Sequence, residues 1–415
     1  MVRVNANEQV GSPGPAVNRA PAHGAGRSVE NPVGLPVVTM IGGGQLARMC
    51  AGPAAELALT LSVFAESDDA AAALVVPHAP VGDYRDAEQV REWARGCDVV
   101  TFDHEHVPAD VLAALEADGV ALHPRPSALR FAQDKLAMRQ RLSDLDVPCP
   151  AWAPVSTSDE LSAFGEQHGW PLVLKTPTGG YDGKGVMLVR TPDDADAWFA
   201  QADGAPLLAE EAVAFEREIA VMIARSPSGQ VAVWPVVETV QVDGICTEVL
   251  APAPDLSDDA AERITSAAIT IARELDVTGV MAVELFDVGG GGGGEFVVNE
   301  LAMRPHNSGH WSMDGSVTGQ FEQHLRAVLD LPLGDTRARA PWTVMGNVLG
   351  GEYEELYPTY KHLMARDPGL KIHLYGKGVR PGRKIGHVNV FGDDLVGLRA
   401  RARHACDYLQ GTVTE

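Results

Sequence analysis

A short apolar segment that runs into a glycine turn and then into a helical sequence places the strongest limit on the fold. Residues 37–41 read Val-Val-Thr-Met-Ile, residues 42–44 are all glycine, and residues 45–49 have a helical composition. The apolar pattern of a strand returns at residues 59–65 and 98–102. Strands that alternate with helices predict a parallel, doubly wound sheet. We therefore expect an α/β domain over residues 36–130.

A different pattern begins near residue 151. Further strand-like segments lie at residues 171–175, 186–189, 218–224, 231–237, 280–287 and 295–301. Together with helical segments such as 258–275, they predict an α+β domain of antiparallel strands over residues 131–334. One helix is expected over residues 128–145, before the prolines that follow it. A small third domain is expected over residues 335–415.

The composition argues against several kinds of partner. The chain has 33 Lys and Arg against 56 Asp and Glu, a formal charge of −23. Nonspecific nucleic-acid binding needs a basic surface, so no nucleic-acid partner is expected. No apolar run is long enough to span a membrane as a helix, so no membrane partner is expected either.

The N-terminal residues and the cysteines indicate the cellular setting. Residues 1–35 are rich in Gly, Pro, Ala and Asn and lack the apolar centre of a secretion signal, so we interpret them as a disordered tail. The five cysteines are scattered and form no C-x-x-C pair. This pattern indicates reduced thiols in a cytoplasmic protein rather than disulfides or zinc ligands.

The first glycine turn allows three interpretations. Gly42, Gly44 and Ala47 fit the pattern G-x-G-x-x-A, and Glu66 follows about 20 residues later. Such glycines let a phosphate approach backbone amides at a helix N-terminus. The turn is therefore an NAD site, a site for another phosphate or small ligand, or a plain tight turn.

A second glycine-rich loop is more distinctive. Lys175 ends an apolar strand, and residues 176–185 read Thr-Pro-Thr-Gly-Gly-Tyr-Asp-Gly-Lys-Gly. The loop is not a Walker A motif, because G-x-x-x-x-G-K-[ST] is absent. Two lysines could clamp an oxyanion, and Tyr181 and Asp182 within so flexible a loop suggest a lid over a ligand. The alternative is a flexible turn with solvated lysines.

Two carboxylates in apolar strands suggest a metal site. Glu284 and Glu300 lie on strands that are joined through the six glycines of residues 289–294. A hairpin over this connection would place both carboxylates side by side. With Asn299, these hard oxygen donors suit Mg²⁺ that bridges phosphates. The alternative is a strand whose polar side faces water.

Three further polar segments are candidates for binding. The first contains Glu210, Glu211 and Glu218, at and after the end of a short strand. There a carboxylate and a backbone amide can bind a ribose and a purine edge. The alternative is a solvated acidic face. Residues 304–311, Arg-Pro-His-Asn-Ser-Gly-His-Trp, follow the second carboxylate strand and suggest an anion or substrate site. Residues 361–387 concentrate Lys and Arg in an acidic chain and favour a phosphate or carboxylate pocket over a solvated basic face.

With these segments in place, the chain resembles the N5-carboxyaminoimidazole ribonucleotide synthase family of the ATP-grasp superfamily. The resemblance covers residues 36–400 and rests on the following stretches of this sequence: G-G-G-Q-L-A-R-M, F-D-H-E-H-V, Q-D-K, K-T-P-T-G-G-Y-D-G-K-G, N-E-L-A-M-R-P-H-N-S-G-H-W and R-P-G-R-K-I-G-H. It implies a preATP-grasp domain, an ATP-grasp domain that holds ATP between two antiparallel sheets, and a small C-terminal domain.

The resemblance also implies roles for particular residues. It implies Mg²⁺ ligands at Glu284 and Glu300, and catalytic roles for Lys175, Lys184, Arg304, His306 and Asn307. It implies ATP contacts at Arg130, Lys175, Gly180, Tyr181, Asp182, Gly183, Lys184, Gly185, Glu210, Glu211, Ala212, Val213, Glu218, Gln241, Asn299 and Glu300. It implies substrate contacts at Gln45, Leu46, Glu105, Tyr181, Asp182, His310, Lys377, Arg383 and Lys384.

This sequence departs from the family pattern in places. Gln241 stands where the family often has His, and Asp103 replaces the first Glu of F-E-x-E. The six-glycine insert and the N-terminal tail are additional.

The implied reaction is the ATP-dependent carboxylation of aminoimidazole ribonucleotide by bicarbonate through carboxyphosphate, with ATP and Mg²⁺ bound, in a cytoplasmic homodimer. A lid would keep the labile acyl phosphate from water. Three alternatives remain open. They are a formate-dependent glycinamide ribonucleotide transformylase of the same superfamily, an NAD-linked oxidoreductase, and a non-catalytic nucleotide-binding regulator.

Overall fold

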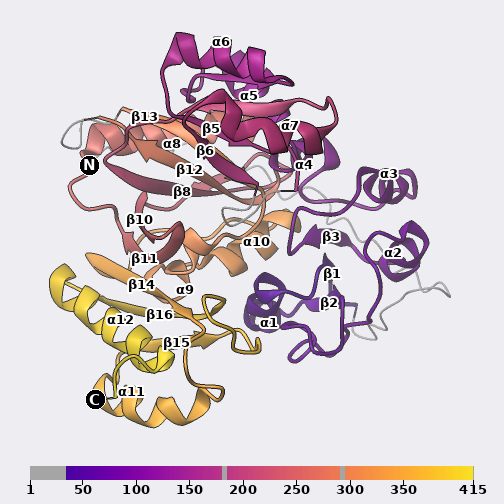
Figure 1. The fold of residues 1–415 in the computed structure, drawn as a ribbon. Coiled ribbons are helices and arrows are strands. Elements are labelled where there is room, and N and C mark those ends of the chain that lie inside the picture. Colours follow the sequence, from indigo (N-terminus) through magenta and orange to yellow (C-terminus); the bar gives the residue numbers. More distant parts are fainter. Residues whose placement is uncertain (1–33, 180–184, 290–294, 415) are drawn as a thin grey trace, which may run out of the picture.

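The computed structural model describes residues 34–179, 185–289 and 295–414 (Figure 1). Five residues with predicted roles, Gly180, Tyr181, Asp182, Gly183 and Lys184, therefore lie outside the described residues, as do residues 1–33 of the expected tail and residues 290–294 of the glycine insert. No helix in the described ranges is long and apolar enough to cross a membrane.

The N-terminal region contains the predicted parallel sheet. Its strands are β1 (Val37–Ile41), β2 (Thr60–Phe64) and β3 (Val99–Phe102), in the order β2-β1-β3 with both pairs parallel. The helices of this region are α1 (Gln45–Glu56), α2 (Ala87–Ala94) and α3 (Ala109–Ala117). All five residues of β1 are buried, as expected for the central strand of a sheet covered on both faces.

The single helix expected over residues 128–145 is two helices, so that prediction is wrong. Helix α4 (Pro126–Gln133) ends before Asp134, and α5 (Lys135–Asp144) begins after it. The Asp134 carboxylate accepts hydrogen bonds from the amides of Leu136 and Ala137, and its backbone is extended. A capping aspartate starts a new helix here because it satisfies amides that have no partner within the helix.

A four-stranded antiparallel sheet follows, in the order β4-β7-β5-β6. Its strands are β4 (Trp152–Val155), β5 (Leu172–Lys175), β6 (Val186–Val189) and β7 (Leu207–Glu211). Apolar side chains of α6 (Ser158–His168) and α7 (Asp196–Ala202) pack on it, with the short helix η1 (Pro192–Ala195) between them. Because one face is covered by these helices, the other face can meet the second sheet.

The second sheet has nine described strands and is antiparallel throughout. They are β8 (Arg217–Arg225), β9 (Val231–Val233), β10 (Val237–Val242), β11 (Ile245–Ala251), β12 (Gly279–Asp287), β13 (Phe296–Ala302), β14 (Trp342–Leu349), β15 (Lys371–Leu374) and β16 (Lys384–Gly392). The strand expected over residues 231–237 is divided between β9 and β10, because the ladder is interrupted around Pro235, which has no amide hydrogen to donate.

The expected third domain continues the central sheet. Strand β14 pairs with β11, and β16 and β15 extend the sheet beyond it. Helix α12 (Leu395–Gln410) packs on β14 and β16, and η3 (Tyr357–Thr359) and α11 (Tyr360–Arg366) lie nearby. The boundary expected near residue 334 therefore does not interrupt the hydrogen-bonded ladder.

Helix α10 (Gln320–Val328) joins the N-terminal region to the large sheet (Figure 1). Its His324 Nε2 lies 2.8 Å from the Thr101 hydroxyl on β3, and its Nδ1 accepts a 3.1 Å hydrogen bond from the Val280 amide on β12. Burial lowers the pKa of His324 to about 3, so the ring is neutral at physiological pH. The remaining helices are α8 (Asp258–Glu274), η2 (Asn307–Gly309) and α9 (Ser312–Gly315).

Candidate active site

The glycine turn after β1 is occupied by carboxylates of the protein itself. The Gly43 amide donates to Glu66 Oε2 at 3.0 Å, and the Ala47 amide donates to Asp103 Oδ1 at 2.7 Å. A Cβ on Gly44 would lie 2.0 Å from Asp103 Oδ2, so Gly44 is what allows this carboxylate to approach the start of α1. A pyrophosphate would have to displace Asp103. This arrangement disfavours the NAD interpretation.

Residues from opposite ends of the chain meet beside this turn. Lys377 Nζ donates to Gln45 Oε1 at 2.6 Å. The basic segment that holds Lys377 is fixed against the end of β14, since the Gly350 amide donates to the Arg383 carbonyl at 2.8 Å. Gly382 has a φ of +73°, a conformation that favours glycine, and it turns the chain just before Arg383. The structure thus brings Gln45 and Lys377 of the predicted substrate set into contact.

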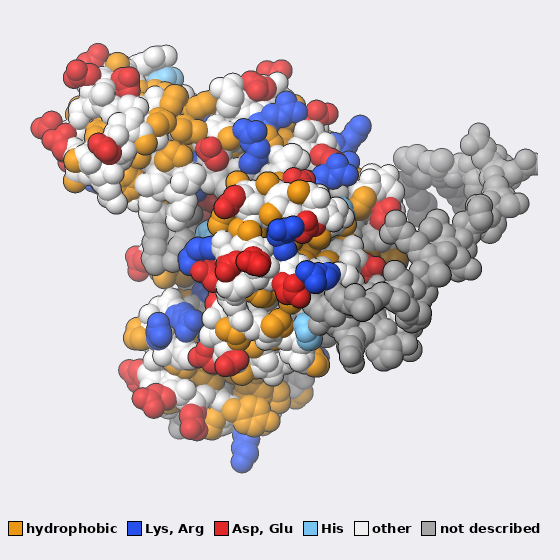
Figure 2. Space-filling view, turned by 90° about the vertical axis from the view of Figure 1, so that its right-hand side faces the viewer, with side chains coloured by type: hydrophobic (Ala, Val, Ile, Leu, Met, Phe, Trp, Pro, Cys, Tyr) orange, Lys and Arg blue, Asp and Glu red, His pale blue; other side chains and the backbone are white. Residues whose placement is uncertain are grey.

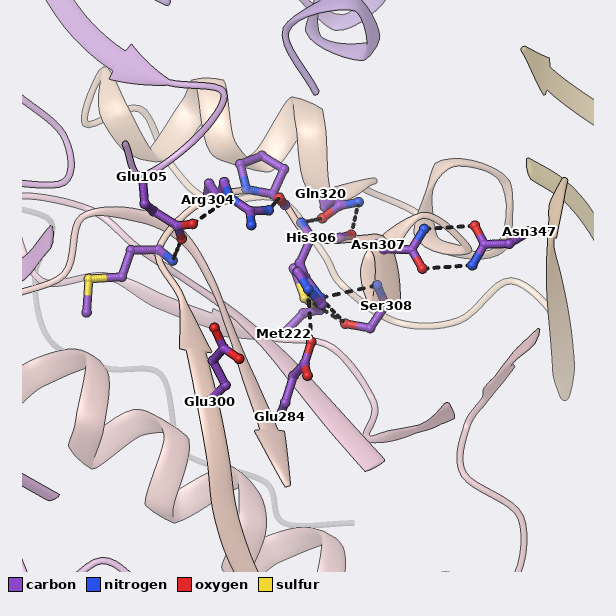
Figure 3. A network of polar contacts seen from close by, with 12 residues as sticks. Glu105, Met222, Glu284, Glu300, Arg304, His306, Asn307, Ser308, Gln320 and Asn347 are labelled. Carbon is purple, nitrogen blue, oxygen red and sulfur yellow. Dashed lines mark hydrogen bonds and ion pairs between the residues drawn. The ribbon is translucent and has the colours of Figure 1, made fainter. Parts of the chain in front are cut away.

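Glu105 connects the N-terminal region to the polar loop after β13. Its two carboxylate oxygens accept hydrogen bonds from the Met303 amide at 2.9 Å and from Arg304 Nε at 3.0 Å. Figure 3 shows this pairing above the two carboxylate strands. Because Glu105 holds both the backbone and the guanidinium, it fixes the position from which Arg304 can reach an anion.

Glu284 and Glu300 lie opposite each other on β12 and β13, as the hairpin prediction requires. His306 Nε2 lies 2.9 Å from Glu284 Oε1, and Lys135 Nζ lies 3.9 Å from Glu300 Oε1. Figure 3 shows His306 directly beside Glu284. Lys135 begins α5 and ends the Q-D-K stretch, but the sequence had predicted no role for it.

The environments of the two carboxylates differ in ways that suit a cation. Desolvation raises the pKa of Glu284, but His306, together with the charges of Lys384 and Arg304, outweighs it, so the net pKa is lowered. Desolvation raises the pKa of Glu300, Lys135 opposes this, and the nearby Glu284 and Glu105 add to the rise. A cation would relieve this repulsion.

The donor set fits Mg²⁺ that is shared with a ligand. The described ranges contain no group of three or more His, Cys, Asp or Glu side chains placed to hold a metal ion. Mg²⁺ in nucleotide sites commonly takes one or two carboxylates and completes its shell with phosphate oxygens and water. Glu284 and Glu300 supply that pair, so the residues present fit the expected ion.

Glu210 is buried between two cations. Its carboxylate is 2.5 Å from Arg139 Nε and 2.7 Å from Lys175 Nζ. Desolvation raises the pKa of Glu210, but Arg139 and Lys175 outweigh it and lower the net value. Lys175 also donates to Asn299 Oδ1 at 3.3 Å, and Arg139 donates to the Asn299 carbonyl at 2.7 Å. This network joins the small sheet to β13.

Arg139 and Lys135 were missed by the sequence analysis, although a signal was present. The buried positions of α5 are Lys135, Met138, Arg139 and Leu142, which follow the spacing of one helix face. Two cations on an otherwise apolar face require buried carboxylates as partners. The signal is readable only once the helix is known to begin at Lys135.

The other predicted nucleotide contacts are distributed around this network. Glu218 lies near Gln241, and desolvation together with Glu284 raises the pKa of Glu218 to about 7, although the hydrogen bond from Gln241 opposes the rise. Glu211 Oε1 accepts a 2.8 Å hydrogen bond from the Ala151 amide. Arg130 is exposed on α4, with its guanidinium 5.1 Å from the Phe131 ring. Ala212 and Val213 follow β7, and Gly185 precedes β6.

The polar loop after β13 divides into two parts. Arg304 and His306 face the carboxylates, whereas Asn307 forms a reciprocal amide pair with Asn347 on β14, at 2.9 and 2.8 Å. His310 is fully buried and its Nδ1 lies 2.8 Å from Gln320 Nε2. Asn307 and His310 therefore contact protein groups in this structure, and their direct roles in catalysis or substrate binding stay predictions.

Two facing sheets with a lysine, a carboxylate pair and a glycine-rich loop define an ATP-grasp enzyme. The family model of the ATP-grasp domain matches residues 140–321, that of the ribonucleotide synthetase preATP-grasp domain matches residues 35–133, and that of the phosphoribosylaminoimidazole carboxylase C-terminal domain matches residues 343–401. These matches confirm the predicted fold class and its three kinds of domain.

Individual relatives identify the family within the ATP-grasp enzymes. N5-carboxyaminoimidazole ribonucleotide synthase of Mycobacterium tuberculosis (strain ATCC 25618 / H37Rv) is 50% identical over 379 residues, which cover 90% of this chain and 88% of the relative. That of Corynebacterium ammoniagenes is 47% identical over 381 residues, which cover 91% and 92%. The chain belongs to the N5-carboxyaminoimidazole ribonucleotide synthase family, as its sequence predicted.

Solved structures of members of this family have a fold similar to that of this chain. The synthetase from Thermus thermophilus is 36% identical, with a TM-score of 0.80 and coverage of 91% of this chain and 99% of that one. The synthase from Aspergillus clavatus, in a complex with ADP and 5-aminoimidazole ribonucleotide, is 32% identical, with a TM-score of 0.81 and coverage of 90% and 98%.

Proposed function

We propose that this protein is a ligase that uses ATP to carboxylate 5-aminoimidazole ribonucleotide with bicarbonate, which yields N5-carboxyaminoimidazole ribonucleotide, ADP and phosphate in purine biosynthesis. The observation that carries the proposal is the arrangement of Glu284, Glu300 and His306 beside Lys175 and Arg304, within a chain that belongs to this family. The complex of the Aspergillus clavatus relative with ADP and 5-aminoimidazole ribonucleotide supports the choice of substrate.

The first step is the transfer of the γ-phosphoryl group. An oxygen of bicarbonate attacks the γ-phosphorus, the bond to ADP breaks, and carboxyphosphate forms. Lys175, which pairs with Glu210, would contribute positive charge to the phosphate oxygens, and Lys135 on α5 and Arg304 in the polar loop would add to it. Mg²⁺ held by Glu284 and Glu300 would supply further charge neutralisation for the phosphates.

The second step is the transfer of the carboxyl group. The exocyclic amine of the ribonucleotide forms a bond to the carboxyl carbon, the carbon–oxygen bond to phosphate breaks, and the amine loses one proton. We expect Glu105 and Gln45 to contact the substrate, and Lys377, Arg383 and Lys384 to supply charge for its 5′-phosphate. The hydrogen bond from Lys377 to Gln45 supports this grouping. His306 favours the ionised form of Glu284, because its Nε2 lies 2.9 Å from Glu284 Oε1 and donates a hydrogen bond to it.

We further propose that the enzyme acts as a cytoplasmic homodimer without nucleic-acid or membrane partners. The net charge of −23 supports the absence of a nucleic-acid partner. On the face drawn in Figure 2, acidic and basic side chains are mixed over the described residues and form no continuous basic area there. Light scattering coupled to gel filtration tests the dimer.

Transfer of an isotope from bicarbonate tests the proposed chemistry. When ¹⁸O-labelled bicarbonate attacks the γ-phosphorus, one labelled oxygen stays bonded to phosphorus after the carboxyl group has left. We expect inorganic phosphate with one ¹⁸O atom, measured by mass spectrometry. Phosphate that takes its new oxygen from labelled water instead would contradict the carboxyphosphate step.

A further inference from the structure

The buried side chain of Gln320 holds the loop that carries His306. Gln320 is fully buried at the first position of α10. Its Oε1 accepts from the His306 amide at 2.9 Å, and its Nε2 donates to the His306 carbonyl at 2.9 Å. The side-chain amide thus pairs with the backbone of His306 as a neighbouring strand would, and Figure 3 shows both contacts.

The second amide hydrogen of Gln320 is also used. Its Nε2 lies 2.8 Å from His310 Nδ1. Because an amide nitrogen can only donate, His310 Nδ1 accepts and the proton of this neutral ring is on Nε2. Burial and the surrounding positive charge lower the pKa of His310 well below its usual value, which agrees with a neutral ring. Both ends of the loop, His306 and His310, are therefore fixed by one side chain.

The absence of a side chain at Gly309 allows the side-chain amide of Gln320 to lie close to the loop that carries His306. A Cβ at this position would lie 2.6 Å from Gln320 Oε1 and 3.0 Å from Met222 Cε. The Ser312 hydroxyl also holds this region: it accepts a hydrogen bond from the backbone amide of Gln320 at 2.9 Å and donates one to the Gly309 carbonyl at 2.6 Å. The loop is thus shaped to receive this particular side chain.

We propose that Gln320 is a positioning residue for the carboxylation reaction and acts through His306. The inference rests on the proposed function, because His306 contacts the Glu284 carboxylate that the reaction uses. If the Gln320 amide were lost, the His306 backbone would lose two hydrogen bonds and the imidazole could rotate away from Glu284. A displacement of about 1 Å near reacting groups can reduce a rate about a hundredfold.

The same helix provides a matched control. Gln323 is also fully buried, and its amide also pairs with a backbone: its Nε2 donates to the Gly334 carbonyl at 2.8 Å, and its Oε1 accepts from the Gly334 amide at 2.7 Å. Gly334 belongs to a loop that contributes no residue to the candidate site. Replacing Gln323 therefore removes similar hydrogen bonds without moving His306.

The experiment compares Gln320→Met, Gln323→Met, His306→Ala and the double variant His306→Ala/Gln320→Met in the full-length enzyme. We expect Gln320→Met to lower kcat about ten- to a hundredfold while KM for ATP stays within about twofold. Gln323→Met should lower the melting temperature by about as much as Gln320→Met does, but it should leave kcat unchanged. In the His306→Ala background, Gln320→Met should lower kcat no further, because its effect passes through His306.

Three results would overturn the inference: a kcat for Gln320→Met within twofold of the wild type, an equal loss in Gln323→Met, or additive losses in the double variant. If Gln320→Met does not fold, Gln320→Glu takes its place, since it keeps the acceptor for the His306 amide and loses both donors. Failure of the proposed function would be distinguishable, because the wild type itself would then show no ribonucleotide-dependent ADP release.

Discussion

Replacing the buried Arg139 by Met should destabilise the protein more than the same replacement of Arg141, a partly exposed arginine on the same helix. The Arg139 side chain is fully buried and Glu210 is 3% exposed, with 2.5 Å between Arg139 Nε and Glu210 Oε1. Breaking a buried pair by removing one partner costs about 3–5 kcal/mol. Lys175 Nζ remains 2.7 Å from the carboxylate, so we expect the lower end of that range, about 3 kcal/mol.

Urea unfolding of Arg139→Met at neutral and acidic pH measures this effect. Arginine keeps its charge, so the pH dependence comes from Glu210, whose pKa in the folded protein is lowered from 4.5 because its two cations outweigh its desolvation. A lowered pKa contributes stability above the unfolded value, and this contribution is lost as the pH falls through the folded value. The gap between wild type and variant should therefore be widest near pH 7 and should narrow below about pH 4.5.

Arg141→Met is the matched control, since Arg141 lies on the same helix in a partly exposed pair with Glu274. Its loss should cost less than about 1 kcal/mol. Equal stability of Arg139→Met and Arg141→Met, or a stability gap between wild type and Arg139→Met that does not change with pH, would rule out the buried ion pair as the source of the effect. A pH-independent gap would mean that Arg139 contributes packing and not charge.

Three further predictions address the metal, the substrate and the glycine turn. Glu300→Gln should keep the far-ultraviolet circular dichroism of the wild type and lower ATP turnover at least about a hundredfold. The exposed control Glu295→Gln should keep normal ATP turnover, and normal turnover by Glu300→Gln would refute the metal assignment. Arg383→Ala should raise KM for the ribonucleotide about ten- to a hundredfold and change KM for ATP much less, whereas Arg337→Ala, an exposed control outside the basic segment, should change neither. An unchanged ribonucleotide KM would exclude Arg383 from the phosphate site. Gly44→Ala should destabilise the protein by about 1–3 kcal/mol in thermal unfolding, because the added Cβ would collide with Asp103. Gly52→Ala, within the helix α1 that Gly44 precedes, has open space at its Cβ and should not destabilise; equal stability of the two variants would refute the close approach.

The features that sequence predicted are those fixed over short distances in the chain. The parallel sheet followed from strands that alternate with helices, and the facing of Glu284 and Glu300 followed from one hairpin. The strand that ends at Lys175 was also predicted from local sequence. In each case the residues that specify the structure lie within one or two neighbouring elements, where period and turn chemistry are informative.

The features that sequence did not predict depend on contacts across the fold. Arg139 finds Glu210 at a distance of 71 residues in the chain, and no local pattern specifies that partner. The pairing of β11 with β14 likewise joins segments that are separated by three α-helices, one short 3₁₀ helix and two strands. Gln320 resembles an ordinary helix-start residue, and its role becomes visible only when the His306 backbone is placed beside it. The break at Asp134 was readable in principle as a capping aspartate, but the cations around it suggested a continuous helix.

The most direct test of the central claim is the release of ADP from ATP in ¹⁴C-bicarbonate buffer, measured with and without 5-aminoimidazole ribonucleotide. We expect the ribonucleotide to accelerate ADP release, with one carboxyl label entering the ribonucleotide for each ADP formed. ADP release that does not respond to the ribonucleotide, or that proceeds without incorporation of label, would rule out the proposed carboxylation.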